Sequence, residues 1–392
     1  MNVKKWDEPY KNKKVLGEDI LIGVAKDGSL IYLPADKGEP SRNVAVFYGS
    51  NSQKKSFLIT RTFVSILSGR NIVVLSSDIK NDIYDFAREQ DYVIKELNFD
   101  DLNSQSNHWE LLGLINKDDG MNSVQNFTQR IIKANKLIPS KNQVNAFNYI
   151  NAVLLYICFC SNEKLKKVSH YIINYDDFEK EILKLNSTNN VKQFYEFAKN
   201  ANNYFKWDIP TISNIIHPFF SKSVMNILNS GSMSLEEFKN DKCIYVINPS
   251  VIYSWLPPFI LSYILDLDLD CDVFIDQGDF CIPDFKNAIK KGDKKIYMLS
   301  HNMQDVQLNY PDILSGFGTK ISFHGCDINA AKYLSEISGI NAGNNKLDEI
   351  WAPQEIVSCG QDKELLFVLS AKRYLYKTIN LSYLNDVIKA SL

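Results

Sequence analysis

The chain has 392 residues, of which 45% are hydrophobic and 23% are charged, and its formal net charge is −2. This composition is typical of a globular protein with a large core, and it excludes disordered, collagen-like and coiled-coil proteins. The near-neutral charge gives no overall attraction to nucleic acid or to anionic lipid, so any such binding requires a local basic surface.

The seven cysteines include no C-x-x-C pair, which favours reduced thiols over a disulfide framework or a zinc site. Every apolar run is shorter than the 18 or so residues that a membrane span needs. The charged N-terminus is not followed by an apolar signal segment. We therefore expect no membrane span and a cytoplasmic protein.

The first predicted elements are two strands, 20–23 and 30–33, which flank a Lys-Asp-Gly turn and so form a hairpin. Strands and helices then alternate. The predicted strands cover 43–50, 71–77 and 92–99, and the predicted helices cover 54–68 and 81–90. This alternation is typical of βαβ units and of a parallel sheet.

The pattern changes over 111–238, where helical periodicity replaces the strand signals. Strands then return, and we predict them over 242–250, 271–277, 294–300, 320–325 and 365–379. Their continuous apolar runs indicate strands that are buried on both faces of a sheet. We therefore predict an α/β core made of residues 1–110 and 239–392, interrupted by an all-α insertion domain over 111–238.

The first candidate functional segment is Gly49-Ser-Asn-Ser-Gln-Lys-Lys-Ser56, at a predicted strand-to-helix junction. It follows the phosphate-loop pattern G-x-x-x-x-G-K-[ST] at Gly49, Lys55 and Ser56, but Lys54 stands where the second glycine is expected. That glycine lets the main chain approach the phosphates closely, which a lysine hinders. The alternative interpretation is a lysine-rich helix start without a nucleotide.

The second candidate is Asp276, which ends the apolar strand 271–277 as the Mg²⁺-facing carboxylate of a Walker B element does. Gln277 stands where a glutamate normally polarises the attacking water. Because an amide cannot accept the proton of that water, we expect weak hydrolysis or none. Ser300 and Gln304 close and follow the strand 294–300, where a polar residue could sense a γ-phosphate. For Asp276 the alternative interpretation is a buried strand that ends in a solvated aspartate. For the segment with Ser300 and Gln304 it is a helix-capping or surface histidine, His301.

Taken in order, these segments resemble the type IV coupling proteins, the TraG/TraD-like ATPases of conjugation and type IV secretion. The loop over 43–56 is similar to the phosphate loop of that family. Asp78, Lys80 and Tyr84 match its D-P-K-G-E-x-Y segment, and Trp109 matches a tryptophan that follows. The segments 276–285 and 299–304 resemble its D-E-F and sensor regions, with the glutamate lost.

The resemblance implies a RecA-like P-loop NTPase core with a mainly parallel sheet and an inserted all-α domain. It implies ATP and Mg²⁺ as cofactors, with Ser56 and Asp276 as the metal-holding residues if ATP binds. The implied nucleotide-binding residues are Gly49, Ser52, Lys54, Lys55, Ser56, Asp78 and Lys80. The implied catalytic and sensor-like residues are Asp276, Gln277, Ser300 and Gln304.

The joint departures at Lys54, Gln277 and Ser300 favour a pseudo-ATPase that acts as an adaptor or assembly subunit of a conjugative DNA-transfer or type IV secretion system. Whether ATP is bound at all stays open. Coupling proteins normally begin with transmembrane helices, which this sequence lacks, so we expect it to reach the inner face of the membrane through partners such as a membrane-bound coupling protein.

Two other interpretations stay open: an active, DNA-translocating coupling ATPase, and an unrelated α/β binding protein. DNA is a further candidate partner. A basic surface for it is predicted at the lysines that follow the Asp276 strand, with a solvated lysine face as the alternative; these are Lys286, Lys290, Lys291, Lys294 and Lys295.

Overall fold

The computed structural model describes most of the chain. The described residues are 10–12, 19–24, 30–33, 42–78, 81–100, 107–109, 115, 119–134, 143–161, 166–200, 210, 212–213, 222–228, 233, 238, 242–250, 252–276, 281–338, 340–343, 346–349, 351–358 and 367–369.

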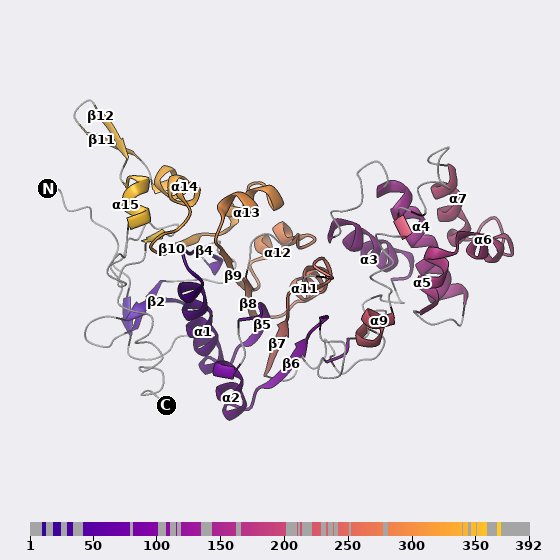
Figure 1. Ribbon diagram of the computed structural model, residues 1–392, viewed down its shortest axis with the longest axis horizontal. Helices are drawn as coiled ribbons and strands as arrows, with labels where there is room; N and C mark the ends of the chain where they lie inside the picture. Colours follow the sequence, from indigo (N-terminus) through magenta and orange to yellow (C-terminus); the bar gives the residue numbers. More distant parts are fainter. Residues whose placement is uncertain are drawn as a thin grey trace.

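The centre of the molecule is an eight-stranded sheet in the order β13-β10-β4-β9-β8-β5-β7-β6 (Figure 1). Its strands are β4 (Val44–Phe47), β5 (Asn71–Leu75), β6 (Val93–Leu97), β7 (Cys243–Ile247), β8 (Cys271–Asp276), β9 (Lys295–Ser300), β10 (Thr319–Ser322) and β13 (Phe367–Leu369). All neighbours are parallel except β13, which pairs antiparallel with β10. The predicted parallel sheet is therefore confirmed; of the strand expected over 365–379, residues 365–366 and 370–379 lie outside the described part.

Helices cover both faces of this sheet, which is why its strands carry apolar residues without a break. Val44 and Val46 of β4 pack with α1 (Asn51–Leu67) and α2 (Asn81–Glu89) in one cluster. Ala45 and Phe47, which alternate with them, belong to the core on the opposite face. That face is covered by α11 (Leu256–Asp266), α12 (Phe285–Lys291), α13 (Met303–Asn309), α14 (Ile328–Ser338) and α15 (Pro353–Ser358). The result is a three-layer α/β fold.

Two small antiparallel sheets flank the central one. The first has the order β1-β3-β2 and consists of β1 (Tyr10–Asn12), β2 (Ile20–Val24) and β3 (Leu30–Leu33). It confirms the hairpin predicted from the sequence, and Leu21 and Tyr32 bury against the α1 side of the core. The second is the hairpin of β11 (Ile340–Gly343) and β12 (Lys346–Glu349).

Among the described residues between β6 and β7 the named elements are all helices, and Figure 1 shows them gathered on one side of the sheet. They are α3 (Met121–Ala134), α4 (Gln143–Leu155), which continues as a π-helical turn (Tyr156–Cys160), α5 (Lys166–Ile173), α6 (Tyr175–Leu183), α7 (Asn190–Asn200) and α9 (Lys222–Leu228). The two chain segments that connect them to the core are tied together. Trp109 N donates to Ile227 O at 2.8 Å, and Met233 N donates to His108 O at 3.0 Å.

Within the described residues, one helix, Gln143–Cys160, is long and apolar enough by length and composition to cross a membrane. We did not expect such a segment from the sequence. Most of it is buried, and α4 lies against α3 and α7. A core helix of a helical domain meets the same criteria.

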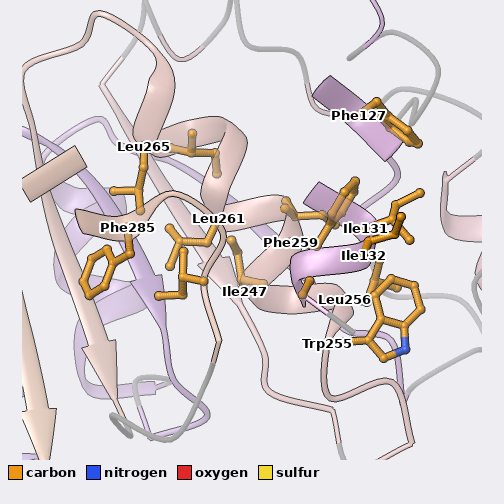
Figure 2. Close-up of a cluster of buried hydrophobic side chains, with 14 of the residues drawn as sticks. Phe127, Ile131, Ile132, Ile247, Trp255, Leu256, Phe259, Leu261, Leu265 and Phe285 are labelled. Carbon is orange, nitrogen blue, oxygen red and sulfur yellow. The ribbon is translucent and has the colours of Figure 1, made fainter. Parts of the chain in front are cut away.

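The helix α11 connects the helical group to the sheet (Figure 2). Phe127 and Ile131 of α3 face Phe259 of α11, and the rings of Phe127 and Phe259 meet edge to face with centroids 5.4 Å apart. On its other side, Leu261 of α11 lies near Ile247 of β7. The helical group thus reaches the core through one apolar layer.

One buried cation reinforces this contact. Arg130 of α3 forms an ion pair with Asp266, donates to the carbonyl oxygen of Ser262 at 2.7 Å and lies 4.4 Å from the ring centroid of Tyr263. All three partners belong to α11, so this one guanidinium fixes how α3 lies on that helix.

We predict that Arg130→Met lowers the free energy of unfolding by about 1.5–3 kcal/mol, because a hydrogen-bonded charge is lost while the aliphatic stem is kept. Lys133→Met is the matched control, since Lys133 pairs with Asp284 at 2.8 Å on an exposed surface and should contribute at most about 1 kcal/mol. Urea denaturation measures both; equal losses would show that the Arg130 contact is dispensable.

Candidate functional site

The carboxyl ends of four neighbouring parallel strands bring the predicted site residues to one edge of the sheet. In the order β4-β9-β8-β5, Gly49 follows the first strand, Ser300 ends the second and Asp276 ends the third. Asp78 lies just after β5. Ligands of open α/β sheets bind at this edge, so the fold puts these residues where a site is expected.

The centre of the site is the ammonium group of Lys54, in the second turn of α1. Its Nζ lies 2.9 Å from Asp276 Oδ2 and 2.8 Å from Asp78 Oδ2. The side chains of Lys54 and Asp276 are only 6% and 4% exposed. Ser76 Oγ donates to the same Asp276 oxygen at 2.9 Å, whereas Asp276 Oδ1 is buried and has no hydrogen-bond partner among the described residues.

Burial and charge act in opposite directions on this pair. Burial lowers the pKa of the Lys54 ammonium, but its bonds to Asp78 and Asp276 outweigh that effect and raise the pKa above its usual value. Burial raises the pKa of the Asp276 carboxyl, and Lys54 and Ser76 only partly compensate. Lys54 therefore stays charged and neutralises a carboxylate that the protein has taken out of water.

The segment that the sequence suggested as a phosphate loop is the cap and first turn of a helix. The helix α1 begins at Asn51, ahead of the predicted start at residue 54, and Ser50 is its N-cap. Gln53 Oε1 accepts the N–H groups of Gly49 at 3.0 Å and Ser50 at 3.1 Å, and Ser50 Oγ accepts that of Gln53. These amides, which a phosphate loop would direct at its ligand, are thus used within the chain.

Gly49 is required here by packing. A Cβ atom on it would lie 2.5 Å from the main-chain oxygen of His324 and 2.6 Å from the carbonyl carbon of Gly325. Gln53 Nε2 also donates to His324 O, at 3.2 Å. The turn after β4 is therefore pressed against the turn after β10, and only glycine fits between them.

Four of the residues implied by the resemblance lie on α1, and of these only Lys54 is buried; the other three are Ser52, Lys55 and Ser56. Lys55 is exposed on α1, Ser56 is half-buried in the same helix, and Ser52 is exposed with its Oγ 3.0 Å from Ser50 Oγ. It is Lys54, at the position of the missing glycine, that reaches Asp276. Lys80 and Gln277 lie outside the described residues.

The sensor-like residues make local contacts. Ser300 Oγ donates to the carbonyl oxygen of Asn302 at 2.8 Å. Asn302 caps α13 by accepting the N–H of Gln304, whose side chain is exposed. Both residues therefore shape the turn between β9 and α13.

Part of the predicted basic surface is absent. Lys294 and Lys295 are buried, and Lys294 Nζ bonds to the carbonyl oxygen of Leu267 and, at 2.8 Å, to Asp293. They do not contribute to a nucleic-acid surface because both side chains are buried. Lys286, Lys290 and Lys291 of α12 are exposed.

Sequence reasoning missed the roles of Gln53, Ser76 and His324. The first had a signal, since Ser50 and Gln53 have the S-x-x-Q spacing of a capping box, which predicts that the helix starts at once. The other two act across long chain separations, through a buried hydroxyl and a main-chain oxygen, and no local pattern marks them.

The described residues do not fit MgATP in the manner of a P-loop enzyme. The amides of Gly49, Ser50 and Gln53 are already bonded within the chain, and an ammonium lies between the two carboxylates that a metal ion would need. Among the residues for which positions are given, no cluster of three or more histidine, cysteine or acidic residues offers another metal site.

A scan against protein-family models and a search of curated proteins gave no match. Among solved structures, the chain is similar to the bacterial conjugative coupling protein TrwB in an unbound form, at 12% identity over 91% of this chain and 88% of that one, with a TM-score of 0.66. TrwB in complex with ADP and Mg²⁺ matches at 13% identity with the same coverage and TM-score. VirB4 of Thermoanaerobacter pseudethanolicus matches at 10% identity over 93% and 97% of the two chains, with a TM-score of 0.51.

These similarities show that the chain has the P-loop NTPase fold of the type IV coupling proteins. The fold that the sequence resemblance implied is confirmed.

We predict that Gly49→Ala lowers the free energy of unfolding by about 1–3 kcal/mol, because two main-chain segments would have to move apart. Chemical denaturation measures the loss. Asn51→Ala, at the exposed first position of the same helix, is the control and should change stability by less than about 0.5 kcal/mol. A Gly49→Ala variant as stable as this control would contradict the packing argument.

We predict that Lys54→Met is destabilised by about 3–5 kcal/mol near neutral pH, because it leaves the buried Asp276 charge without a partner. Lys55→Met, one residue along and exposed, should be close to neutral. Adding Asp276→Asn to Lys54→Met should recover part of the loss in a double-mutant cycle.

The same variant gives a pH test. Burial raises the pKa of Asp276, so its ionised form costs stability, and this cost disappears as the pH falls through that pKa. The deficit of Lys54→Met relative to Lys55→Met should therefore be smaller in mildly acidic buffer than at pH 7.5. A deficit independent of pH would show that an unpaired carboxylate is not its cause.

Proposed function

We propose that the protein is a coupling-protein-like component of a conjugative DNA-transfer or type IV secretion system, and that it is a pseudo-ATPase which serves as an adaptor or assembly subunit. The observation that carries the proposal is the ammonium of Lys54 between Asp78 and Asp276. The similarity to TrwB, a conjugative coupling protein, supports the cellular context.

An ATPase of this fold changes the edge of its sheet as it binds and releases nucleotide and metal. In this protein, side chains of α1 bind the edge of the sheet where nucleotide and metal would bind. Lys54 joins α1 to the ends of β5 and β8, and Gln53 joins the same helix to the turn after β10. A subunit held in one arrangement is suited to present a fixed surface to partners, which is what an adaptor does.

We place the protein in the cytoplasm, at the inner face of the membrane when partners bring it there. A membrane-bound coupling protein is the partner class we expect, because the two chains would share one fold. The exposed lysines of α12, Lys286, Lys290 and Lys291, are the described residues where DNA contact would be tested first.

An active ATP-binding coupling ATPase is the second candidate. One observation favours it: Asp276 Oδ1 is buried and has no hydrogen-bond partner in the part of the chain that the structure describes, so one acceptor of the Walker-B-type carboxylate is still available. In that case Lys54 would have to leave the site and the first turn of α1 would have to unwind before phosphate could enter.

We predict no saturable heat when MgATP is titrated into the purified chain up to millimolar concentration, and no phosphate release above the buffer rate with or without single-stranded DNA. A known P-loop ATPase serves as the positive control of both assays. Saturable binding that Lys55→Ala abolishes, with turnover stimulated by DNA, would establish the motor and refute the pseudo-ATPase.

A further inference from the structure

We infer that Lys54 is a built-in cation which occupies a latent divalent-metal site formed by Asp276, Asp78 and Ser76. The inference rests on the proposed function and deepens it, because it states what took the place of the metal ion. It concerns the ion alone and requires no nucleotide.

The geometry of the three oxygen donors supports the inference. Two carboxylate oxygens lie 2.8 and 2.9 Å from Lys54 Nζ, and the Ser76 hydroxyl lies 2.9 Å from one of them. Carboxylate and hydroxyl oxygens are donors that Mg²⁺, Mn²⁺ and Ca²⁺ accept, at about 2.0–2.6 Å. The two carboxylate oxygens would have to close in by less than about 1 Å to hold such an ion.

The charge balance points the same way. One ammonium faces two carboxylates, so the cluster has a formal net charge of −1, and a divalent ion in place of the ammonium would bring that charge to zero. Asp276 Oδ1 is a second, independent sign. It belongs to a residue that is 3% exposed, and no described residue donates a hydrogen bond to it, although a buried carboxylate oxygen without a donor is costly.

Gln53 takes the place of a bound anion, as Lys54 takes the place of a bound cation. Its Oε1 sits between the consecutive amides of Gly49 and Ser50, as an oxyanion does in a backbone nest. Because Gln53 and Lys54 are neighbours in the first turns of α1, one short helical segment supplies both groups. Both are covalently attached, so they have a high effective concentration and a free ion competes poorly with them.

The test measures Mn²⁺ binding by electron paramagnetic resonance to the full chain in nucleotide-free buffer. We expect Lys54→Met to take up one Mn²⁺ at least tenfold more tightly than the wild type, and its melting temperature to rise when Mn²⁺ or Mg²⁺ is added. The double variant Lys54→Met/Asp276→Asn should lose this uptake, and Lys55→Met should behave as the wild type. A folded Lys54→Met that binds no more Mn²⁺ than the wild type overturns the inference.

Lys54→Gln is the second variant, because its amide still donates to one carboxylate and so supports folding. If Lys54→Met folds only when Mn²⁺ is present, as followed by circular dichroism, the inference is supported. If neither variant takes up or is rescued by Mn²⁺, it is overturned. The wild-type assays with MgATP separate the two proposals. Saturable binding with DNA-stimulated turnover refutes the pseudo-ATPase, whereas no turnover in the wild type and no Mn²⁺ uptake in the variants refutes the latent metal site alone.

Discussion

Asp276 ends a strand that is buried on both faces, so its carboxylate has to be neutralised inside the protein. Water cannot do this at 3% exposure, and a free carboxylate in such surroundings would cost several kcal/mol. In this chain the neutralising charge comes from Lys54. Its ammonium group has to reach Asp276, and this requirement constrains the helix and the turn from which Lys54 extends. The helix α1 must begin early enough to direct that side chain inward, and the turn before it must be tight enough to need Gly49.

The same strand connects the edge to the rest of the molecule. The chain passes from α11 directly into β8, and α11 is the helix on which α3 of the helical group lies. One short path therefore joins Asp276, α11 and α3. In a motor of this fold such a path could carry a nucleotide-dependent movement, whereas here the ion pair at its end favours a single arrangement.

Much of the fold could be predicted from the sequence, because strands buried on both faces have long apolar runs and the helices between them are periodic. The ends of two strands were predicted to within one residue, at Asp276 and at Ser300. The site was predicted less well. The motif suggested Lys55 as the ligand-facing lysine, but the early start of α1 turns Lys54 inward, and the ion pair joins residues that are 222 positions apart.

Burial was also hard to predict for lysines. Lys294 and Lys295 look like part of a basic run, yet both are buried because a strand begins there and the ammonium of Lys294 bonds to a carbonyl oxygen and to Asp293. A charge run shows which residues are basic, but the position of the sheet edge decides which of them meet solvent.

The hydrogen bond from Gln53 to His324 uses the main-chain oxygen of the histidine, so the imidazole ring is not needed for it. Residue 324 could therefore be substituted in evolution without loss of this hydrogen bond. Ser50, Gln53 and Lys54 act through their own side chains, and Gly49 acts through its lack of one, so these four positions are constrained in identity. We therefore expect the sequence pattern G-S-x-x-Q-K after an apolar strand, in place of G-x-x-x-x-G-K, to identify other chains of this fold. In such chains a glutamine and a lysine of the first helix would occupy the phosphate and metal positions as they do here.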